Sequence, residues 1–292
     1  MPATFAVDLC HLRKDGKPNT SDGSAPDSVK LGHAFFEVLG VTRQASGDEP
    51  TGTPFAERVA ADLATRVGAS PGTVVVEPEK ALNVFQQYRH VGALTDISVE
   101  PSKAYTKAWT RLRTEVGKRI VSPPAAARRA QALVQAVEDA VADEVATRRR
   151  ALYEVGAESL LRLDVTVSDP QANRLPELEI GLSLKWSLRT DRAQDCRSQG
   201  AKLSALRRGR MPHFAALTME PRPYMLNLLG GGSGDVDCVY HLHLPALTQA
   251  IEDVYGSQTN KNAQRTYSNF QRLVEQRRLR DYDELVKYAV SL

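Results

Sequence analysis

Two segments that alternate apolar and polar residues constrain the fold of this chain more than any other feature. In residues 161–167 the odd positions are apolar and the even positions polar, which predicts a half-buried strand with Asp164 on its solvated face. Residues 177–186 alternate in the same way, with Ser183 and Lys185 on the polar side. The pattern predicts two neighbouring strands, but any open sheet that faces water on one side would show the same alternation.

The polar sides of these strands carry residues that suit metal-assisted phosphodiester hydrolysis. Asp164 offers acidic oxygens for a divalent ion, and Lys185 offers an ammonium group. An ammonium group can stabilise negative charge or orient an attacking water molecule. We therefore take both residues as candidate catalytic groups.

Strands and helices interleave along the rest of the chain, without repeats. Further strands are expected at residues 73–76, 213–218 and 236–244, which makes five in all. Helical periodicity and capping residues predict helices at 29–41, 53–67, 80–94, 102–120, 125–153, 191–206 and from 247 onward. This alternation predicts a single α/β domain.

The composition excludes several classes of protein. The chain has 292 residues, 42% of them hydrophobic, and no apolar run near the roughly 18 residues of a membrane span. Three cysteines without a CxxC pair, and an N-terminus unlike a secretory signal, indicate a cytoplasmic protein. A net charge of +3 is too small for a general nucleic-acid coat, although basic residues cluster locally.

Three segments carry a resemblance to a known family. SLKWSLRTDRAQ at 183–194, GRMPHFAALTMEPRP at 209–223 and GSGDVDCVYHL at 232–242 resemble the NgoMIV family of type II restriction endonucleases. The resemblance implies a PD-(D/E)xK nuclease fold, with a mixed five-stranded sheet flanked by helices. It further implies one restriction endonuclease domain over residues 1–292, with an N-terminal arm and loops at 1–50 and a catalytic, DNA-reading core at 51–292.

The resemblance implies a magnesium-dependent site. Asp164 matches the metal-binding aspartate and Lys185 the catalytic lysine. Ser183 matches a serine that stands where many relatives have a carboxylate, and Glu57 matches a glutamate from the first long helix.

One position departs from the family pattern. The family's further glutamate, on the helix after the strand, is Gln199 here. An amide oxygen can still contact Mg²⁺ or its bound water, though more weakly than a carboxylate. Asp195 lies one helical turn earlier on the same face and is the alternative metal ligand.

Arg189, Asp191 and Arg192 match the family's readers of a CCGG core. An arginine fork pairs with guanine O6 and N7, and a carboxylate accepts from cytosine N4. We expect Thr190 or Asp191 to cap the helix that follows. The alternative interpretation is a surface capping cluster with a local ion pair.

Asp22 matches a reader of the outer base pair, which implies GCCGGC as the whole site. Its expected arginine partner aligns with Met225, whereas Arg222 lies three residues earlier. Either Arg222 reaches into the site or the outer pair is read differently.

A zinc site at Cys238, His241 and His243 is disfavoured, because alternation places the cysteine on the opposite strand face from both histidines. The resemblance therefore implies a Mg²⁺-dependent enzyme that cuts double-stranded DNA at a CCGG-centred palindrome and leaves 5′ overhangs. A palindromic target requires at least a homodimer, and the resemblance implies a tetramer. The alternative is a sequence-specific DNA-binding protein of the same fold with impaired catalysis.

Overall fold

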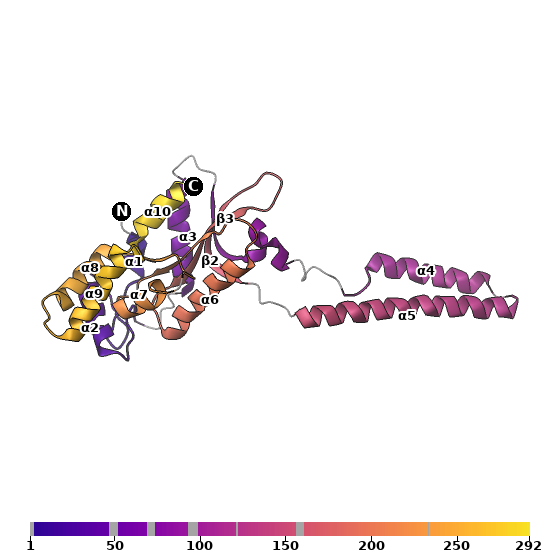
Figure 1. The fold of residues 1–292 in the computed structure, drawn as a ribbon, viewed down its shortest axis with the longest axis horizontal. Coiled ribbons are helices and arrows are strands. Elements are labelled where there is room, and N and C mark those ends of the chain that lie inside the picture. Colours follow the sequence, from indigo (N-terminus) through magenta and orange to yellow (C-terminus); the bar gives the residue numbers. More distant parts are fainter. Residues whose placement is uncertain are drawn as a thin grey trace. The chain divides into compact units, whose positions relative to one another are not determined.

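A computed structural model describes residues 3–46, 52–68, 74–92, 99–120, 122–155, 161–232 and 234–292. The chain divides into two compact units (Figure 1). We call Met1–Arg89 with Leu161–Leu292 the sheet unit, and His90–Leu160 the hairpin unit. The hairpin unit is inserted in sequence between two strands of the sheet unit, so the division does not by itself separate two independently folding domains.

One mixed sheet of six strands forms the sheet unit, in the order β1-β2-β3-β4-β5-β6. The first two pairings are antiparallel and the last three are parallel. The strands are β1 (Val75–Ala81), β2 (Arg162–Asp169), β3 (Glu177–Lys185), β4 (His213–Thr218), β5 (Cys238–His241) and β6 (Leu279–Asp281). The predicted α/β class is confirmed, with six strands in place of five. The additional strand, β6, is three residues long, too short to reveal alternation.

The segment after β1 differs from the sequence prediction. Lys80 and Ala81 pair with β2, opposite Leu163 and Arg162, where a helix was expected. Two short 3-10 helices follow, η1 (Leu82–Val84) and η2 (Gln86–Gly92). Pairing with a neighbouring strand outweighs the local helical periodicity here. Thr73 and Leu94, the outer ends of these two predictions, lie outside the described residues.

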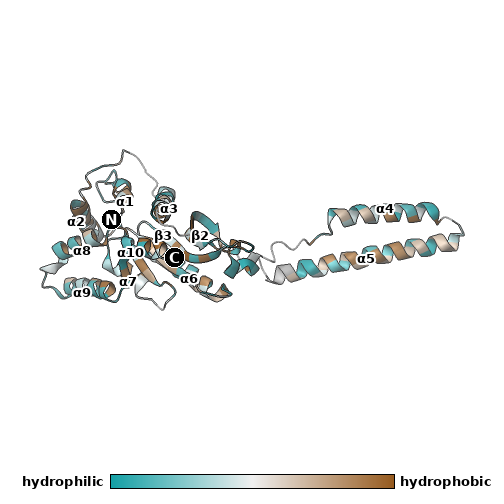
Figure 2. Ribbon diagram, turned by 90° about the horizontal axis from the view of Figure 1, so that it is seen from above, coloured by the Kyte–Doolittle hydropathy of each residue, from teal (hydrophilic) through white to brown (hydrophobic). Residues whose placement is uncertain are grey.

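Helices cover both faces of the sheet. Seen from above, β2 and β3 lie between α3 (Gly52–Gly68) and α6 (Thr190–Leu206) (Figure 2). Phe55 of α3 packs edge-on against Trp186, with ring centroids 5.3 Å apart. On the other side α6 approaches closely at Gly200, where a Cβ would lie 1.8 Å from the carbonyl oxygen of Asp235. Only glycine permits this approach, which brings α6 against the sheet.

This cover changes the environment of the polar strand faces. Thr166 and Ser183 were expected to face solvent, but their exposed fractions are 1% and 0%. The prediction of a solvated face is therefore wrong for these residues, because helix cover buries both faces of the central strands. Asp164 and Lys185 are half-buried.

The remaining helices of the sheet unit surround this core. They are α1 (Thr4–Leu9), α2 (Pro26–Leu39), α7 (Pro223–Gly230), α8 (Leu244–Ile251), the π-helix η3 (Glu252–Gly256), α9 (Lys261–Glu275) and α10 (Tyr282–Val290). The N-terminal residues contribute to the core, since Phe5 packs edge-on against Tyr282 and Phe35 is fully buried.

Two helices side by side form the hairpin unit (Figures 1 and 2). They are α4 (Lys103–Arg119) and α5 (Pro124–Val155), as predicted. Ser102 caps α4 by accepting from the Tyr105 N–H. No residue of α4 is buried. In the described part of the chain, no helix has both the length and the apolar character that crossing a membrane requires.

Candidate active site

Asp164 and Lys185 lie on the same face of adjacent strands. The β2–β3 register pairs Thr166 with Gly181, and two residues further along it brings Asp164 opposite Ser183. The Leu184 N–H donates to Asp164 Oδ2 at 2.6 Å. The carboxylate of β2 is thus bound to the backbone of β3 one residue before the lysine.

Asp195, on the second turn of α6, contacts Lys185. We call Asp164, Lys185 and Asp195 the charged group. Asp195 Oδ2 lies 3.2 Å from Lys185 Nζ and accepts from Gln199 Nε2 at 3.4 Å. The Lys185 side chain is 16% exposed and that of Asp195 56%, so the pair lies at the boundary with solvent. Of the two alternative metal ligands, Asp195 contacts the lysine directly and Gln199 contacts Asp195.

The pKa of Asp164 is shifted by its burial and by the charges around it. Burial raises the pKa of Asp164 above its usual value. The Leu184 N–H and Lys185 oppose the rise, whereas the carboxylates of Asp195 and Glu79 add to it. A bound cation would relieve both the repulsion and the desolvation.

Glu79 is a functional candidate that sequence reasoning missed. The β1–β2 register pairs Pro78 with Val165 and Lys80 with Leu163, so Glu79 lies opposite Asp164. Its φ of 48° is in the left-handed region, which costs a non-glycine residue on the order of 1 kcal/mol or more. Alternation of Glu77 and Glu79 could have revealed it, but β1 was expected to end at Val76.

Glu57 is not brought to this group. It is exposed on α3, which lies on the opposite face of the sheet from α6 (Figure 2). Within the described residues its side chain makes no hydrogen bond or ion pair. Its catalytic role stays a prediction.

Ser183 is fully buried between the sheet and α6. The Cys196 thiol of α6 lies against its hydroxyl. Burial raises the pKa of that thiol to about 11, although Ser183 and Lys185 oppose the rise. The serine thus packs beneath the charged group, shielded from solvent.

Arg189, Asp191 and Arg192 lie at the exposed start of α6. The N-cap is Arg189, and no side chain accepts a hydrogen bond there. The expectation that Thr190 or Asp191 caps the helix is therefore wrong; both lie inside its first turn. Arg192 Nη1 donates to the Ser187 carbonyl at 3.4 Å.

An ion pair between the buried Glu220 and the half-buried Arg222 binds both backbone polar groups of Leu188, the residue before Arg189. The Leu188 N–H donates to Glu220 Oε2 at 2.7 Å, and its carbonyl accepts from Arg222 Nη2 at 2.6 Å. Arg222 Nε lies 2.6 Å from Glu220 Oε1, and Glu220 is fully buried. We call Glu220 and Arg222 the clamp pair.

The clamp pair also reaches Asp22, which is 200 residues away in sequence. Arg222 Nη1 lies 3.3 Å from Asp22 Oδ2. Hydrogen bonds from Ser24 hold the pKa of Asp22 below its usual value, with a further contribution from Arg222. Met225, aligned with the family's arginine, is buried in α7.

The carboxylates in and beside the charged group are of the kind that bind a hard cation. Asp164, Glu79 and Asp195 supply carboxylate oxygens, the donors that Mg²⁺ prefers. As placed, no three Asp, Glu, His or Cys side chains of the described ranges form a ready metal site. Magnesium does not require one, because it usually keeps several waters and takes one or two carboxylates together with a substrate phosphate.

The histidines of the disfavoured zinc site are buried, although alternation had placed them on a polar face. His241 is 0% exposed and its ring packs against Phe35. His243 donates its N–H to His241 Nδ1 at 3.1 Å, and its Nε2 lies 3.0 Å from the Ala3 carbonyl oxygen. The N-terminal helices cover this end of β5, which the strand pattern alone could not reveal.

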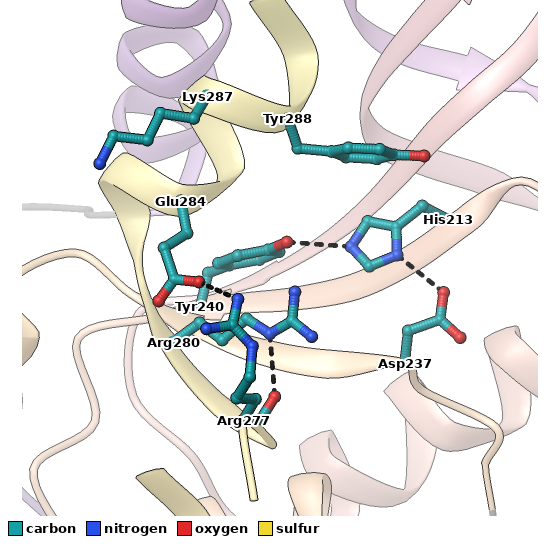
Figure 3. A pocket seen from close by; sticks show the side chains of 8 residues that line it. All are labelled: His213, Asp237, Tyr240, Arg277, Arg280, Glu284, Lys287 and Tyr288. Atoms are coloured by element: carbon teal, nitrogen blue, oxygen red, sulfur yellow. Dashed lines mark hydrogen bonds and ion pairs between the residues drawn. The ribbon is translucent and has the colours of Figure 1, made fainter. Parts of the chain in front are cut away.

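A pocket of about 490 Å³ lies at the other end of the parallel strands (Figure 3). His213 begins β4, whereas Lys185 ends the parallel strand β3. His213 Nδ1 lies 2.9 Å from Asp237 Oδ2, and Nε2 lies 3.1 Å from the Tyr240 hydroxyl. Burial lowers the pKa of His213, but Asp237 and Cys238 outweigh it and raise the pKa to about 9.

Comparison with known proteins gives this arrangement a context. The sequence model described as NgoMIV restriction enzyme matches residues 132–289. This chain belongs to the NgoMIV restriction enzyme family. The type II restriction enzyme NgoMIV of Neisseria gonorrhoeae is 36% identical over 111 residues, which are 38% of this chain and 36% of that relative. The chain thus matches little more than a third of the relative's length.

The NgoMIV family match contains β2, β3, α6 and the clamp pair, and so most of the candidate site. Asp22, Glu57, Glu79 and all of α4 lie outside it.

Proposed function

We propose that this protein is a type II restriction endonuclease that hydrolyses both strands of DNA at a CCGG-centred palindrome, GCCGGC, and leaves four-base 5′ overhangs. The observation that carries the proposal is the convergence of Asp164, Lys185 and Asp195 beside the exposed arginines of α6. Membership of a restriction enzyme family supports the same activity.

In this mechanism Asp164 and Asp195 would hold the divalent ion, and Glu79 is a further carboxylate within reach of the same region. Mg²⁺, when bound, supplies a Lewis acid for the scissile phosphate. Lys185 orients the attacking water or stabilises the charge that develops on the phosphate oxygens. The water oxygen bonds to phosphorus while the bond to the 3′ oxygen breaks, which leaves a 5′-phosphate and a 3′-hydroxyl.

Recognition is assigned to the start of α6. Arg189 and Arg192 are proposed to pair with guanines of the core and Asp191 with a cytosine. Asp22 is proposed to read the outer base pair. Arg222 is proposed to position Asp22 and the Leu188 peptide rather than to read a base, because its Nε and both terminal nitrogens already have protein partners. A palindromic target requires two copies of the chain, and a tetramer is the proposed assembly.

Incubation of a sequenced plasmid with the protein and Mg²⁺ tests this function. Discrete fragments whose ends map to GCCGGC are expected. Fragment ends at unrelated sequences would overturn the recognition assignment, and intact plasmid in Mg²⁺ and Mn²⁺ would overturn the nuclease.

A second candidate is a sequence-specific DNA-binding protein that has lost catalysis. Two observations favour it: Gln199 replaces a carboxylate, and Asp195 is engaged by Lys185 at 3.2 Å. Retarded but uncut DNA carrying GCCGGC would support this alternative.

A further inference from the structure

The outer face of α4 carries a row of cations that the proposed active site does not use. Lys103, Lys107 and Arg111 follow one another at intervals of four residues. Residues four apart lie on the same face of a helix, about 6 Å apart along its axis. All three side chains are exposed, and none forms an ion pair within the described part of the chain. We call these three residues the α4 row.

The α4 row faces away from the contact with α5. That contact is made by Trp109, whose Nε1 donates to Glu138 at 3.2 Å, and by Arg113, which lies 3.0 Å from the same carboxylate. At 3.6 residues per turn, Trp109 lies about 160° and Arg113 about 120° around the helix from Lys107, the middle of the row. Packing within the hairpin therefore does not account for the cations.

Charge is distributed unevenly between the two helices. The segment KAYTKAWTRLRTEVGKR of α4 holds six basic residues and one acidic residue, whereas α5 holds five of each. The acidic residue of α4 is Glu115, which is neutralised by Lys118 at 3.6 Å and Arg119 at 3.3 Å. Beside the row runs a second row of Thr106, Thr110 and Thr114, whose hydroxyls donate to backbone carbonyls one turn earlier. No carboxylate interrupts the cations between Lys103 and Arg111.

We propose that the α4 row binds the phosphate backbone of duplex DNA without reading its sequence. Each DNA strand carries one phosphate per 3.4 Å of axial rise, so alternate phosphates recur at about 7 Å. The spacing of about 6 Å within the row is close to that repeat. The row is straight and cationic, and the exposed large apolar residues of α4, Tyr105 and Leu112, lie about 140° or more around the helix from Lys107. This suits a phosphate backbone better than a lipid or an apolar protein face. DNA as the partner rests on the proposed function.

Counterion release makes the proposal quantitative. Each phosphate neutralised by the protein contributes about 0.9 to the slope of log affinity against log salt. Replacement of Lys103, Lys107 and Arg111 by alanine should therefore reduce the slope by about 2.7. Between 50 and 200 mM salt the wild-type affinity should then fall about 40-fold more than that of the variant.

The experiment measures binding of the full chain to a fluorescent duplex that lacks CCGG, in EDTA, by anisotropy across this salt range. The matched control is Arg148→Ala/Arg149→Ala/Arg150→Ala on α5, which removes the same formal charge from the same unit. Two of those arginines already pair with Glu144 and Glu100. The control should keep the wild-type slope.

An unchanged slope in the α4 variant, or an equal reduction in the control, overturns the proposal. If the α4 variant changes its oligomeric state and keeps the wild-type slope, the proposal is also overturned, because the α4 row would then bind a second copy of the chain. Far-UV circular dichroism checks that α4 remains helical, and Lys103→Gln/Lys107→Gln/Arg111→Gln repeats the test with longer side chains. Wild-type protein that binds this duplex but leaves plasmid uncut would contradict the proposed nuclease and leave this inference standing.

Discussion

The sheet unit and the hairpin unit use charged residues in opposite ways. In the sheet unit, Glu220 is fully buried and shares hydrogen bonds with Arg222 and the Leu188 backbone. In the hairpin unit, α4 has no buried residue, and Lys103 and Lys107 are exposed. A buried, hydrogen-bonded charge fixes geometry, whereas an exposed one acts through long-range attraction that salt screens. In our proposals, chemistry and base reading are assigned to the sheet unit, and sequence-independent attraction to the hairpin unit.

The largest difference between the units is expected in catalysis. Lys185→Ala should reduce the single-turnover rate of cleavage in Mg²⁺ by about 100-fold or more, because it removes charge stabilisation at the scissile phosphate. Binding of GCCGGC duplex in Ca²⁺ should be retained. Lys118→Ala in the hairpin unit, an exposed lysine of α4 outside the α4 row, is the matched control and should cut at the same positions at nearly the wild-type rate. Full activity of Lys185→Ala would refute the assignment of the site.

The next effect concerns stability. Arg222→Ala leaves Glu220 buried without its partner, which should lower the free energy of unfolding by about 3 to 5 kcal/mol. Arg149→Ala breaks the exposed pair with Glu100 and should cost about 1 kcal/mol or less. Urea denaturation measures both losses: Trp186 fluorescence in a Trp109→Phe background reports on the sheet unit, and far-UV circular dichroism reports on the helices of the hairpin unit. Equal losses for the two arginines would remove the contrast between buried and exposed pairs.

A pH dependence should be confined to the sheet unit. The pKa of His213 is raised to about 9, so its stabilising contribution is present below its unfolded value of about 6.5 and disappears as pH rises through 9. Between pH 6 and 10 the free energy of unfolding should fall by about 3 kcal/mol more in the wild type than in His213→Gln. Chemical denaturation at each pH measures this difference. Parallel curves for the two proteins would show that the imidazole is neutral when folded.

The smallest effect is a gain in stability at the active site. Because burial and neighbouring carboxylates raise the pKa of Asp164, its ionised form is less stable in the folded state than in the unfolded chain. Asp164→Asn should raise the midpoint of thermal unfolding while abolishing cleavage. Asp143→Asn on the exposed surface of α5 is the control and should change neither property. A lower midpoint for Asp164→Asn would show that the carboxylate stabilises the fold.

Local pattern predicted much of this fold because the periodicities of strands and helices are properties of short segments. The alternating segments at 161–167 and 177–186 are β2 and β3, and the helices predicted at 102–120 and 125–153 are α4 and α5. The same reasoning misjudged β1, where pairing with β2 extends the strand to Ala81. It also omitted β6, whose three residues contain too little pattern.

The sequence by itself determined the α/β class, the family resemblance and the placement of Asp164 and Lys185 on the polar sides of two strands. Only the tertiary structure decided that Glu79 lies opposite Asp164, that Asp195 contacts Lys185, and that the clamp pair joins Asp22 to the start of α6. It also decided that helices cover the polar strand faces. Alternation reports which side of one strand a residue occupies, whereas these contacts depend on strand register and helix cover, which segments distant in the chain set together.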